Sequence, residues 1–233
     1  MRLYCDLHIH SCLSPCGDEL MTPNNIAGMA MLKGLDAIAV ADHNSARNLP
    51  ALAKTCAAMG VLLLPAMEIT TAEEAHLLAY FPTVEAAVDF SGEIHAFLPP
   101  IPNRPDLFGP QQVLDENDEQ VDTEEFLLLN ALSLSLDELV ERINARGGAA
   151  VPAHINRGNN GLLNVLGFLS PGLEIAAVEV WRALPCPLDV SSLRVLHSSD
   201  AHYLENMLER EVFYDVAEKS VAALFEYVKS GAR

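Results

Sequence analysis

The sequence predicts an α/β protein that folds as a single barrel-like domain, and three observations support this class. Half of the 233 residues are hydrophobic and only 20% are charged, which excludes a disordered chain. Short apolar runs alternate with helical segments from the first residues onward. The length suits one sizeable α/β domain. We therefore expect buried parallel strands covered by helices.

The first half of the chain predicts a β-α-β-α-β order. The opening apolar run closes in DLHIHS, residues 6–11, which is typical of a strand end. Thr22 as N-cap, Pro23 at the first helical position and Gly34 beyond the last turn predict a short helix. LDAIAVADH predicts a buried strand, and a helix is expected over 49–58. VLLLPAME, which ends in Glu68, and AHLLAYF, which opens with His76, predict two further strands.

Residues 99–129 interrupt this order. Pro99, Pro100, Pro102 and Pro105 crowd the start of the segment, and the acidic run LDENDEQVDTEE follows. We expect an insertion within one domain of residues 1–233, with a hairpin that turns in ENDE. A domain boundary in this segment remains an alternative. The acidic run is expected to face solvent.

Regular order resumes at Ser135. Ser135 and Glu138 form an S-x-x-E capping box for a helix that ends near Gly147 and Gly148. AAVPAHI, IAAVEVW and VLHSSDAH predict three more strands, and an amphipathic helix is expected over 221–229.

Charge and composition limit the partners. The 32 acidic and 14 basic residues give a formal charge of −18, which disfavours an extended nucleic-acid groove. A small phosphorylated substrate is compatible with this charge, because bound divalent cations reverse the sign of a pocket. No secretory signal and no apolar run of about 18 residues is present, so we expect a soluble, cytoplasmic protein without a membrane partner. The oligomeric state stays open.

The cysteines predict no disulfide framework, because their number is odd: Cys5, Cys12, Cys16, Cys56 and Cys186. Cys12 and Cys16 lie close to the first histidine pair and are candidate metal ligands. They lack the second cysteine pair that usually completes a zinc site, and small buried thiols are common.

Metal-binding residue types stand at the ends of nearly all the apolar runs. They are His8, His10, Asp42, His43, Glu68, His154, Asp200 and His202, while His76 begins its run. Strand side chains alternate, so His8 and His10 point the same way, as do Asp200 and His202. The ends of parallel barrel strands meet at one mouth. We therefore expect a metal cluster that uses six of the eight histidines.

The remaining polar residues receive supporting roles. His197 has the opposite parity to Asp200, so we expect it to pack or to make a supporting hydrogen bond. His95 is expected to be structural. Asp42, next to His43 but pointing elsewhere, is expected to orient a ligand histidine.

The order DLHIHS, ADHN, Glu68, AHLLAYF, AHINR and SSDAH closely resembles the PHP (polymerase and histidinol phosphatase) superfamily of metal-dependent phosphoesterases, over residues 6–202. The resemblance implies a distorted (β/α)7 TIM-like barrel with a site for three divalent metal ions (Zn, Fe or Mn) at the carboxyl ends of the strands. The implied ligands are His8, His10, Glu68 and Asp200 for the first metal, Glu68, His76 and His154 for the second, and Asp18, His43 and His202 for the third. Asp18 is singled out by the resemblance alone. Ala41 departs from the threonine of many relatives, and the 99–129 insertion leaves the substrate open.

Such a centre suits hydrolysis of a phosphate ester by a metal-activated water, with Glu68, Asp200 and His202 as catalytic residues. Arg157 is the main candidate for phosphate binding, because guanidinium offers bidentate bonds to oxyanions. Asn44 and Ser11 are further candidate substrate contacts, although short polar residues at strand ends commonly satisfy loop backbone instead. The substrate could be a small phosphomonoester, a nucleotide or a short oligonucleotide.

Two other functions remain open. Amidohydrolases also open with H-x-H on a barrel, but they often bridge two metals with a carboxylated lysine. Lys33, Lys54, Lys219 and Lys229 all fall in or beside helical segments, and none of them ends an apolar run. A noncatalytic, metal-stabilised PHP module is the second alternative.

Overall fold

A computed structural model describes residues 1–231 of the chain, and it shows a mixed α/β fold. The first half contains β1 (Arg2–Ile9), α1 (Pro23–Leu32), β2 (Ala37–Val40), α2 (Leu49–Ala58), β3 (Leu62–Leu63), β4 (Ala66–Thr70), β5 (His76–Tyr80) and α3 (Val84–His95). The second half contains α4 (Pro105–Phe108), β6 (Gln112–Leu114), β7 (Gln120–Thr123), α5 (Leu136–Ala145), β8 (Ala149–Pro152), α6 (Leu162–Val165), β9 (Ala177–Glu179), β10 (Arg194–Leu196), the 3-10 turn η1 (Leu204–Asn206), β11 (Phe213–Asp215) and α7 (Val221–Lys229).

The strands do not all run in parallel, which corrects the sequence-based expectation. β1, β2 and β3 are parallel neighbours, as are β9 and β10, but β5 runs antiparallel to both β4 and β8. The reason lies in the connection between β4 and β5, because residues 71–75 are too few for the crossover that parallel neighbours need. The start of β5 therefore lies at the same edge as the end of β4.

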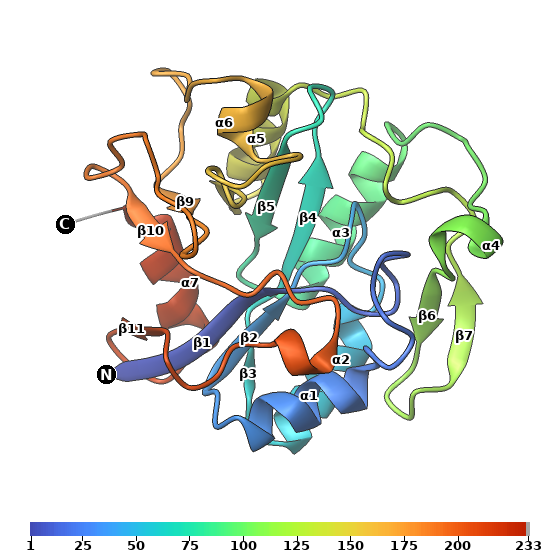
Figure 1. The fold of residues 1–233 in the computed structure, drawn as a ribbon. Helices are drawn as coiled ribbons and strands as arrows, with labels where there is room; N and C mark the ends of the chain where they lie inside the picture. The colour runs from blue at the N-terminus through green and yellow to red at the C-terminus, as the bar shows by residue number, and fades with distance from the viewer. Residues whose placement is uncertain (232–233) are drawn as a thin grey trace.

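Within residues 1–231 the ladders form separate sheets and no closed barrel. Two single parallel bridges connect strand ends across the gaps between sheets. One joins Ile9 to Ala201, and the other joins His43 to Glu68. Figure 1 shows β1, β2, β4 and β5 meeting near the centre of the molecule, with α1 and α2 below them and α3 behind.

Pro65 divides the strand that was expected over VLLLPAME. Proline has no N–H to donate to a ladder, so β3 ends at Leu63, and β4 begins at Ala66 beside a new partner, β5. This break carries Glu68 into the middle of β4, next to the loop after β2.

The predicted helix caps are confirmed. Thr22 accepts a hydrogen bond from the backbone N–H of Asn25, and Pro23 is the first residue of α1. Ser135 and Glu138 form a reciprocal capping box at the start of α5. In the described residues no helix is both long and apolar enough to cross a membrane.

The expected hairpin in the 99–129 segment is present as β6 and β7, which pair antiparallel and are connected by residues 115–119. It lies with α4 at the right of Figure 1, beside α2. Asn48, at the start of α2, binds both the carbonyl of Gln112 and the N–H of Leu114. Hydrogen bonds therefore connect the segment directly to the loop that follows β2.

The hydrophobic core has two parts. One cluster packs helices against the sheets and includes Ile26, Leu52, Phe90 and Leu139. The other contains alternate residues of the strands, including Leu7, Ala39, Leu78 and Val151, together with residues of α7. Both leave the carboxyl ends of β1, β2 and β8 free for polar side chains.

Candidate metal centre

The strand ends bring the predicted ligands together around Glu68. This side chain is only 1% exposed, and it lies within hydrogen-bonding distance of His76 Nδ1 (2.9 Å) and His154 Nε2 (3.1 Å). His43 Nδ1 lies 3.3 Å from the other carboxylate oxygen. The antiparallel direction of β5 is what places His76, its first residue, at this edge.

His8 and His10 point the same way, as predicted. Their Nε2 atoms are 3.2 Å apart. His10 Nε2 lies 3.1 Å from Asp200 Oδ1, and His8 Nε2 lies 3.4 Å from Glu68 Oε1. The bridge between Ile9 and Ala201 sets this approach, since the N–H of His10 donates to the carbonyl of Ala201 at 2.9 Å.

Three overlapping groups of side chains offer donor atoms close enough to share a metal ion. They are His8, His10, Glu68 and Asp200; His43, Glu68 and His76; and His10, His43 and His202. The first coincides with the ligand set expected for the first metal. The other two contain parts of the expected second and third sets. Each pair of groups has one residue in common, which is Glu68, His10 or His43.

Asp18 lies beside the third group but outside it. Its backbone N–H donates to the carbonyl of His202 at 2.9 Å, while its carboxylate accepts from the N–H of Leu20. The chain therefore holds Asp18 next to His202 with its side chain turned into its own loop.

The donor set fits divalent metal ions. Imidazole and carboxylate are the ligands preferred by Zn, Fe and Mn. Nδ1 of His43 is buried and has no hydrogen-bond partner among the described residues, although it lies 3.3 Å from Glu68 Oε2. Buried polar atoms are normally satisfied, so this nitrogen is consistent with a site that completes its contacts with a bound cation.

The charges of the cluster act on one another. Burial raises the pKa of Glu68, but the neighbouring His76 and His8 more than offset this and hold that pKa well below its usual range. Burial and the nearby charge of His10 lower the pKa of His43 and bring the pKa of His202 to about 4. Both imidazoles are therefore neutral at pH 7, as metal ligation requires.

The pKa of His10 shifts in the opposite direction, upward. Burial lowers its pKa, but hydrogen bonds to Asp200 and Glu68 outweigh burial and raise the pKa to about 9. Without a cation, His10 therefore carries a proton at neutral pH. Any metal that binds this nitrogen must displace that proton.

Two predicted ligands sit on unusual backbone. His154 has φ 27° and Asp200 has φ 50°. Left-handed backbone is uncommon for residues other than glycine and costs of order 1–3 kcal/mol. Here it turns the chain just beyond β8 and β10, so that both side chains face the cluster.

Asp42 contacts the predicted ligand His10 through an intermediate, Ser14. It accepts a hydrogen bond from the hydroxyl of Ser14, and the same oxygen of Ser14 lies 3.0 Å from His10 Nδ1. Ser14 also accepts from the N–H of His43. The Asp42–Ser14 pair therefore orients His10 and fixes the loop that carries His43.

Ser11 and Asn44 are engaged within the protein. Ser11 is fully buried and donates its hydroxyl to Asp42. The amide of Asn44 donates to the carbonyls of Leu128 and Asn130, and its oxygen accepts from Thr70. The structure thus gives both residues the backbone and loop contacts that compete with substrate binding.

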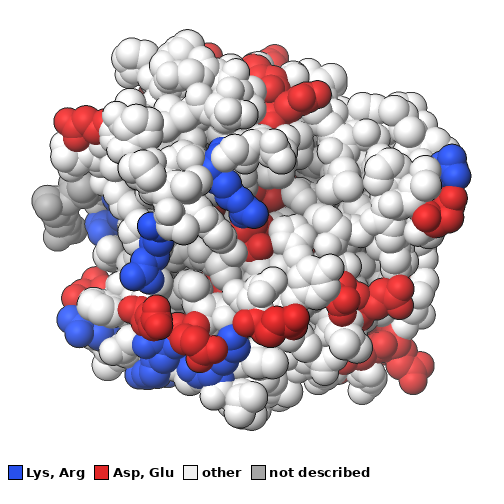
Figure 2. Space-filling model, viewed as in Figure 1, with Lys and Arg blue, Asp and Glu red and all other residues white. Residues whose placement is uncertain are grey.

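Arg157 stands at the entrance of the centre. It lines a pocket of about 150 Å³ together with His43, Glu68, His76, His154, Gly158, Asn159, Asn160, Asp200 and His202. Its guanidinium donates to Oδ2 of Asp200, and its central carbon lies 4.4 Å from the centre of the Trp181 ring. Figure 2 shows a basic side chain next to acidic ones in a central hollow of this face, surrounded by mostly uncharged surface.

Glu179 is a buried residue of the site that the sequence reasoning missed. Its carboxylate lies 3.0 Å and 3.2 Å from Nδ1 of His8 and accepts the backbone N–H of His154. The available signal was an acidic residue inside the apolar run IAAVEVW, since an unpaired buried carboxylate is costly.

The cysteines stay outside the three ligand groups. All five are free thiols. Burial raises the pKa of Cys12 to about 12 and raises that of Cys16 as well, so neither is a ready thiolate ligand.

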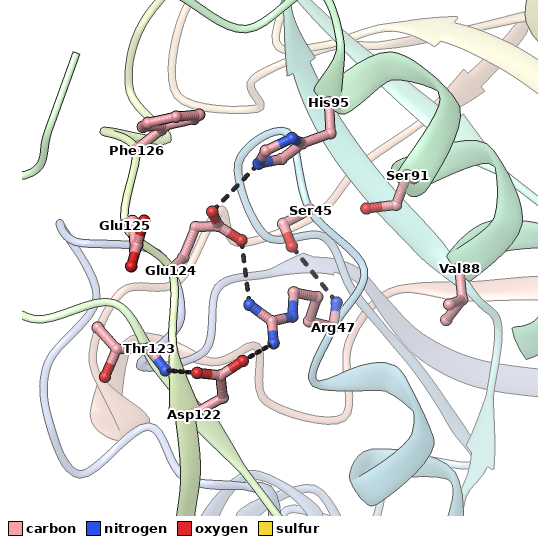
Figure 3. Close-up of a pocket in the computed structure, with 11 residues that line it drawn as sticks. Ser45, Arg47, Val88, Ser91, His95, Asp122, Thr123, Glu124, Glu125 and Phe126 are labelled. Atoms are coloured by element: carbon pink, nitrogen blue, oxygen red, sulfur yellow. Dashed lines mark hydrogen bonds and ion pairs between the residues drawn. The ribbon is translucent and has the colours of Figure 1, made fainter. Parts of the chain in front are cut away.

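A larger cavity of about 510 Å³ lies between α3, the loop after β2 and the 99–129 segment. Figure 3 shows that its charged groups satisfy one another: Glu124 accepts from both Arg47 and His95, and Arg47 also binds Asp122. The ring of His95 stacks near Phe126 at 5.7 Å. His95, which was expected to be structural, is thus held by Glu124 and Phe126, and His197 donates a hydrogen bond to the carbonyl of Val180.

The fold is similar to that of several solved proteins. The lesion-specific endonuclease PfuEndoQ from Pyrococcus furiosus matches with a TM-score of 0.73 at 21% identity, over 100% of this chain and 57% of that chain. A structure of endonuclease Q with a 27-mer duplex that carries an abasic lesion at the active site matches with a TM-score of 0.72 at 20% identity, again over 100% and 57%. The chain thus spans little more than half the length of endonuclease Q.

Two neighbours match over almost their full length. A proposed metal-dependent phosphoesterase from Bifidobacterium adolescentis has a TM-score of 0.58 at 18% identity, with coverage of 98% and 96%. An amidohydrolase from Chromobacterium violaceum, with bound sulfate and no metal, has a TM-score of 0.60 at 17% identity, with coverage of 97% and 96%. These likenesses concern the fold.

No curated protein matches the chain. The family model of the PHP domain matches residues 6–158, which run from within β1 to beyond β8 and include all the predicted ligands except Asp200 and His202. The match covers more than half of the chain and begins at the DLHIHS motif, whose two histidines lie in the cluster. The chain belongs to the PHP domain family.

Proposed function

We propose that the chain hydrolyses phosphate esters at a metal centre built around Glu68. The observation that carries the proposal is the overlap of the three ligand groups, in which one buried carboxylate and two histidines are shared. Adjacent cations repel each other, and a shared anionic ligand offsets this repulsion. An arrangement of this kind suits a cluster of divalent ions better than a single structural site.

We assign three metal positions. His8, His10, Glu68 and Asp200 would hold the first ion, and Glu68, His76 and His154 the second. His43 and His202 would hold the third, together with Asp18, whose carboxylate would have to leave the N–H of Leu20. Zn, Fe and Mn all suit these donors.

Bound divalent ions would supply Lewis-acid charge and lower the pKa of a water molecule. Of the proposed catalytic residues, Glu68 would hold neighbouring ions from its buried position, and Asp200 presents its carboxylate to both His10 and Arg157. His202 is 25% exposed at the mouth and is neutral at pH 7, so it would act on the reaction as a ligand of the third ion, and its Nδ1 is held by the carbonyl of Asp200. Arg157 binds the phosphate.

The substrate proposed from these features is a small phosphomonoester, a nucleotide or the end of a short oligonucleotide. The pocket beside Arg157 is small, about 150 Å³, and the formal charge of −18 opposes a long polyanion. Endonuclease Q, which has a similar fold, binds a DNA duplex, and this favours a larger nucleic-acid substrate. DNA is therefore included among the substrates to be tested.

We further propose that the chain is one domain with residues 99–129 as an insertion, and that its sheets approximate a distorted (β/α)7 barrel. The bridges Ile9–Ala201 and His43–Glu68 support this, because one links β1 to the segment after β10 and the other links the segment after β2 to β4, both at the edge where the site lies. The N–H of Ile155, after β8, also donates to the carbonyl of Glu179 in β9.

An amidohydrolase-type reaction is the second candidate, since a neighbour of similar fold is described as an amidohydrolase. The lysines count against a carboxylated-lysine bridge. Lys54 pairs with Glu116, Lys219 with Asp36, and Lys33 with Glu209, while Lys229 binds the carbonyl of Gly147. None of the four lines the pocket that opens onto Glu68.

The test combines metal analysis with a substrate panel. Elemental analysis of the purified or reconstituted protein should show more than one equivalent of Zn, Fe or Mn. The loaded protein should then release phosphate or cleave a diester in a panel of phosphomonoesters, nucleotides, short RNAs and abasic duplex DNA, and a chelator should abolish turnover. Metal binding without turnover on any phosphate ester would favour a noncatalytic module, and turnover of amides alone would favour the amidohydrolase reading.

A further inference from the structure

Glu179 contacts two predicted ligands from two different metal positions, although it belongs to none of the ligand groups. It is the last residue of β9, and its side chain is 3% exposed. Oε2 lies 3.0 Å from Nδ1 of His8 and accepts the backbone N–H of His154 at 2.9 Å.

The contact with His8 decides which ring nitrogen is available. Oε2 of Glu179 accepts the backbone N–H of His154, and both carboxylate oxygens face Nδ1 of His8, so the carboxylate acts as the acceptor in each contact. Nδ1 of His8 must therefore carry a hydrogen. When the ring is singly protonated, Nε2 is left with its lone pair directed toward His10, Glu68 and Asp200.

The contact with His154 acts on the backbone. His154 has φ 27°, a conformation that costs free energy for a residue with a Cβ. Its N–H finds its acceptor in the Glu179 carboxylate. This bond helps to hold the turn that brings His154 Nε2 to 3.1 Å from Glu68.

We propose that Glu179 is a positioning residue that fixes the tautomer of His8 and the backbone turn of His154, so that one carboxylate prepares ligands of both the first and the second metal. The inference rests on the proposed metal centre and adds to it a residue outside the expected ligand set. Hydrogen-bonding partners of ligand histidines typically change metal affinity by 10–100-fold.

The test uses Glu179→Gln with Glu124→Gln as the matched control. Glu124 is also buried and also accepts from a histidine and a second donor, but it lies in the cavity of Figure 3, outside the ligand groups. A glutamine at 179 keeps the shape but removes the negative charge, and with its oxygen in the place of Oε2 its amide nitrogen would take the place of Oε1, 3.2 Å from the Nδ1–H of His8. Zn²⁺ affinity, measured by competition with a chelator, should fall about 10–100-fold for Glu179→Gln and stay at the wild-type value for Glu124→Gln.

Nitrogen-15 NMR of the Zn²⁺-loaded wild-type protein gives a readout that does not depend on whether the variant folds. Nδ1 of His8 should be protonated and Nε2 metal-bound. The opposite pattern, or equal Zn²⁺ affinity of folded Glu179→Gln and wild type, would overturn the role of Glu179. A wild-type protein that binds no Zn²⁺, Fe or Mn would instead overturn the metal centre itself.

Discussion

Arg157 donates a hydrogen bond to the carboxylate of Asp200, and both side chains line the pocket that opens onto Glu68. The pairing places the one cationic side chain of that pocket's lining beside a predicted ligand of the first metal. The guanidinium has five N–H groups, so it can keep one bond to Asp200 and still offer others to a phosphate. Stacking near Trp181 limits its movement.

Arg157→Ala should therefore lower kcat/KM for a phosphorylated substrate while the metal content stays unchanged. Loss of one charge-assisted phosphate contact costs about 1.5–3 kcal/mol, or roughly one to two decades in kcat/KM. Arg157→Lys should recover only part of this loss, because an ammonium lacks the bidentate fork. Steady-state kinetics and elemental analysis of the same preparations provide the measurement.

Arg182→Ala is the matched control, since Arg182 is 55% exposed and lies 3.9 Å from Glu211. It should leave kcat/KM unchanged. An Arg157→Ala enzyme with unaltered kcat/KM on a verified substrate would make Arg157 a surface charge and leave the metals as the phosphate anchor.

Glu68→Gln should damage the centre more than His76→Ala. Glu68 takes part in two of the ligand groups, whereas His76 takes part in one, and the carboxylate also offsets repulsion between cations. We expect Glu68→Gln to retain fewer metal equivalents than His76→Ala and to lose more activity. The bridging role is wrong if Glu68→Gln keeps both its full metal content and its full phosphatase activity.

Most residues of the cluster could be predicted from the sequence, because they lie at the ends of strands and the direction of a strand side chain follows from its position along the strand. His8 and His10 follow from strand alternation, and their Nε2 atoms indeed meet at 3.2 Å. The helix caps at Thr22 and Ser135 were predictable for the same reason, since capping depends on residues within one turn.

Features that depend on distant contacts were not predictable. The antiparallel direction of β5 and the division of a strand at Pro65 arise from short connections, and periodicity does not report strand direction. Glu179 lies 171 residues from His8, so no spacing rule joins them. Asn44 and Ser11 have the right residue types for substrate contacts, but only the fold reveals that their hydrogen bonds are already used.

Metal affinity should rise with pH between about 6.5 and 9. The proton on His10, whose pKa is about 9, competes with the cation for the same nitrogen. Below pH 9 each unit of pH should therefore raise the apparent Zn²⁺ affinity by up to about tenfold for each proton displaced. Calorimetry in buffers of different ionisation enthalpy measures the protons released, and none released at pH 7 would contradict this interpretation.

His10→Asn supplies the comparison for that experiment. Asparagine removes one titrating group, so the pH dependence between 6.5 and 9 should become shallower, and affinity should be lower throughout. Part of the dependence should remain, because Glu179 and Glu68 outweigh burial and raise the pKa of His8 as well. His95→Asn, outside the ligand groups, should keep the wild-type pH dependence.

The metal-free protein should be most stable near pH 6.5, because the histidines of the cluster are shifted in opposite directions. His10 has a folded-state pKa of about 9 against an ordinary 6.5, so its contribution is complete below pH 6.5 and is lost as the pH rises to 9. His202 has a folded-state pKa of about 4, so the unfolded chain binds a proton first and the fold loses stability as the pH falls from 6.5 to 4. Glu68 and Asp200, with lowered pKa values, add to the loss on the acid side.

Urea unfolding of chelator-treated protein from pH 4 to 9 measures this dependence as the free energy of unfolding. His202→Asn should reduce the decline on the acid side, and His10→Asn should reduce the decline on the alkaline side. Saturating Zn²⁺ should reverse the alkaline decline, because the cation takes the place of the proton that His10 loses and binds only the folded chain with the full ligand set. A free energy of unfolding that keeps rising from pH 6.5 to 9 in the absence of metal would show that His10 is not held in its protonated form by Asp200 and Glu68.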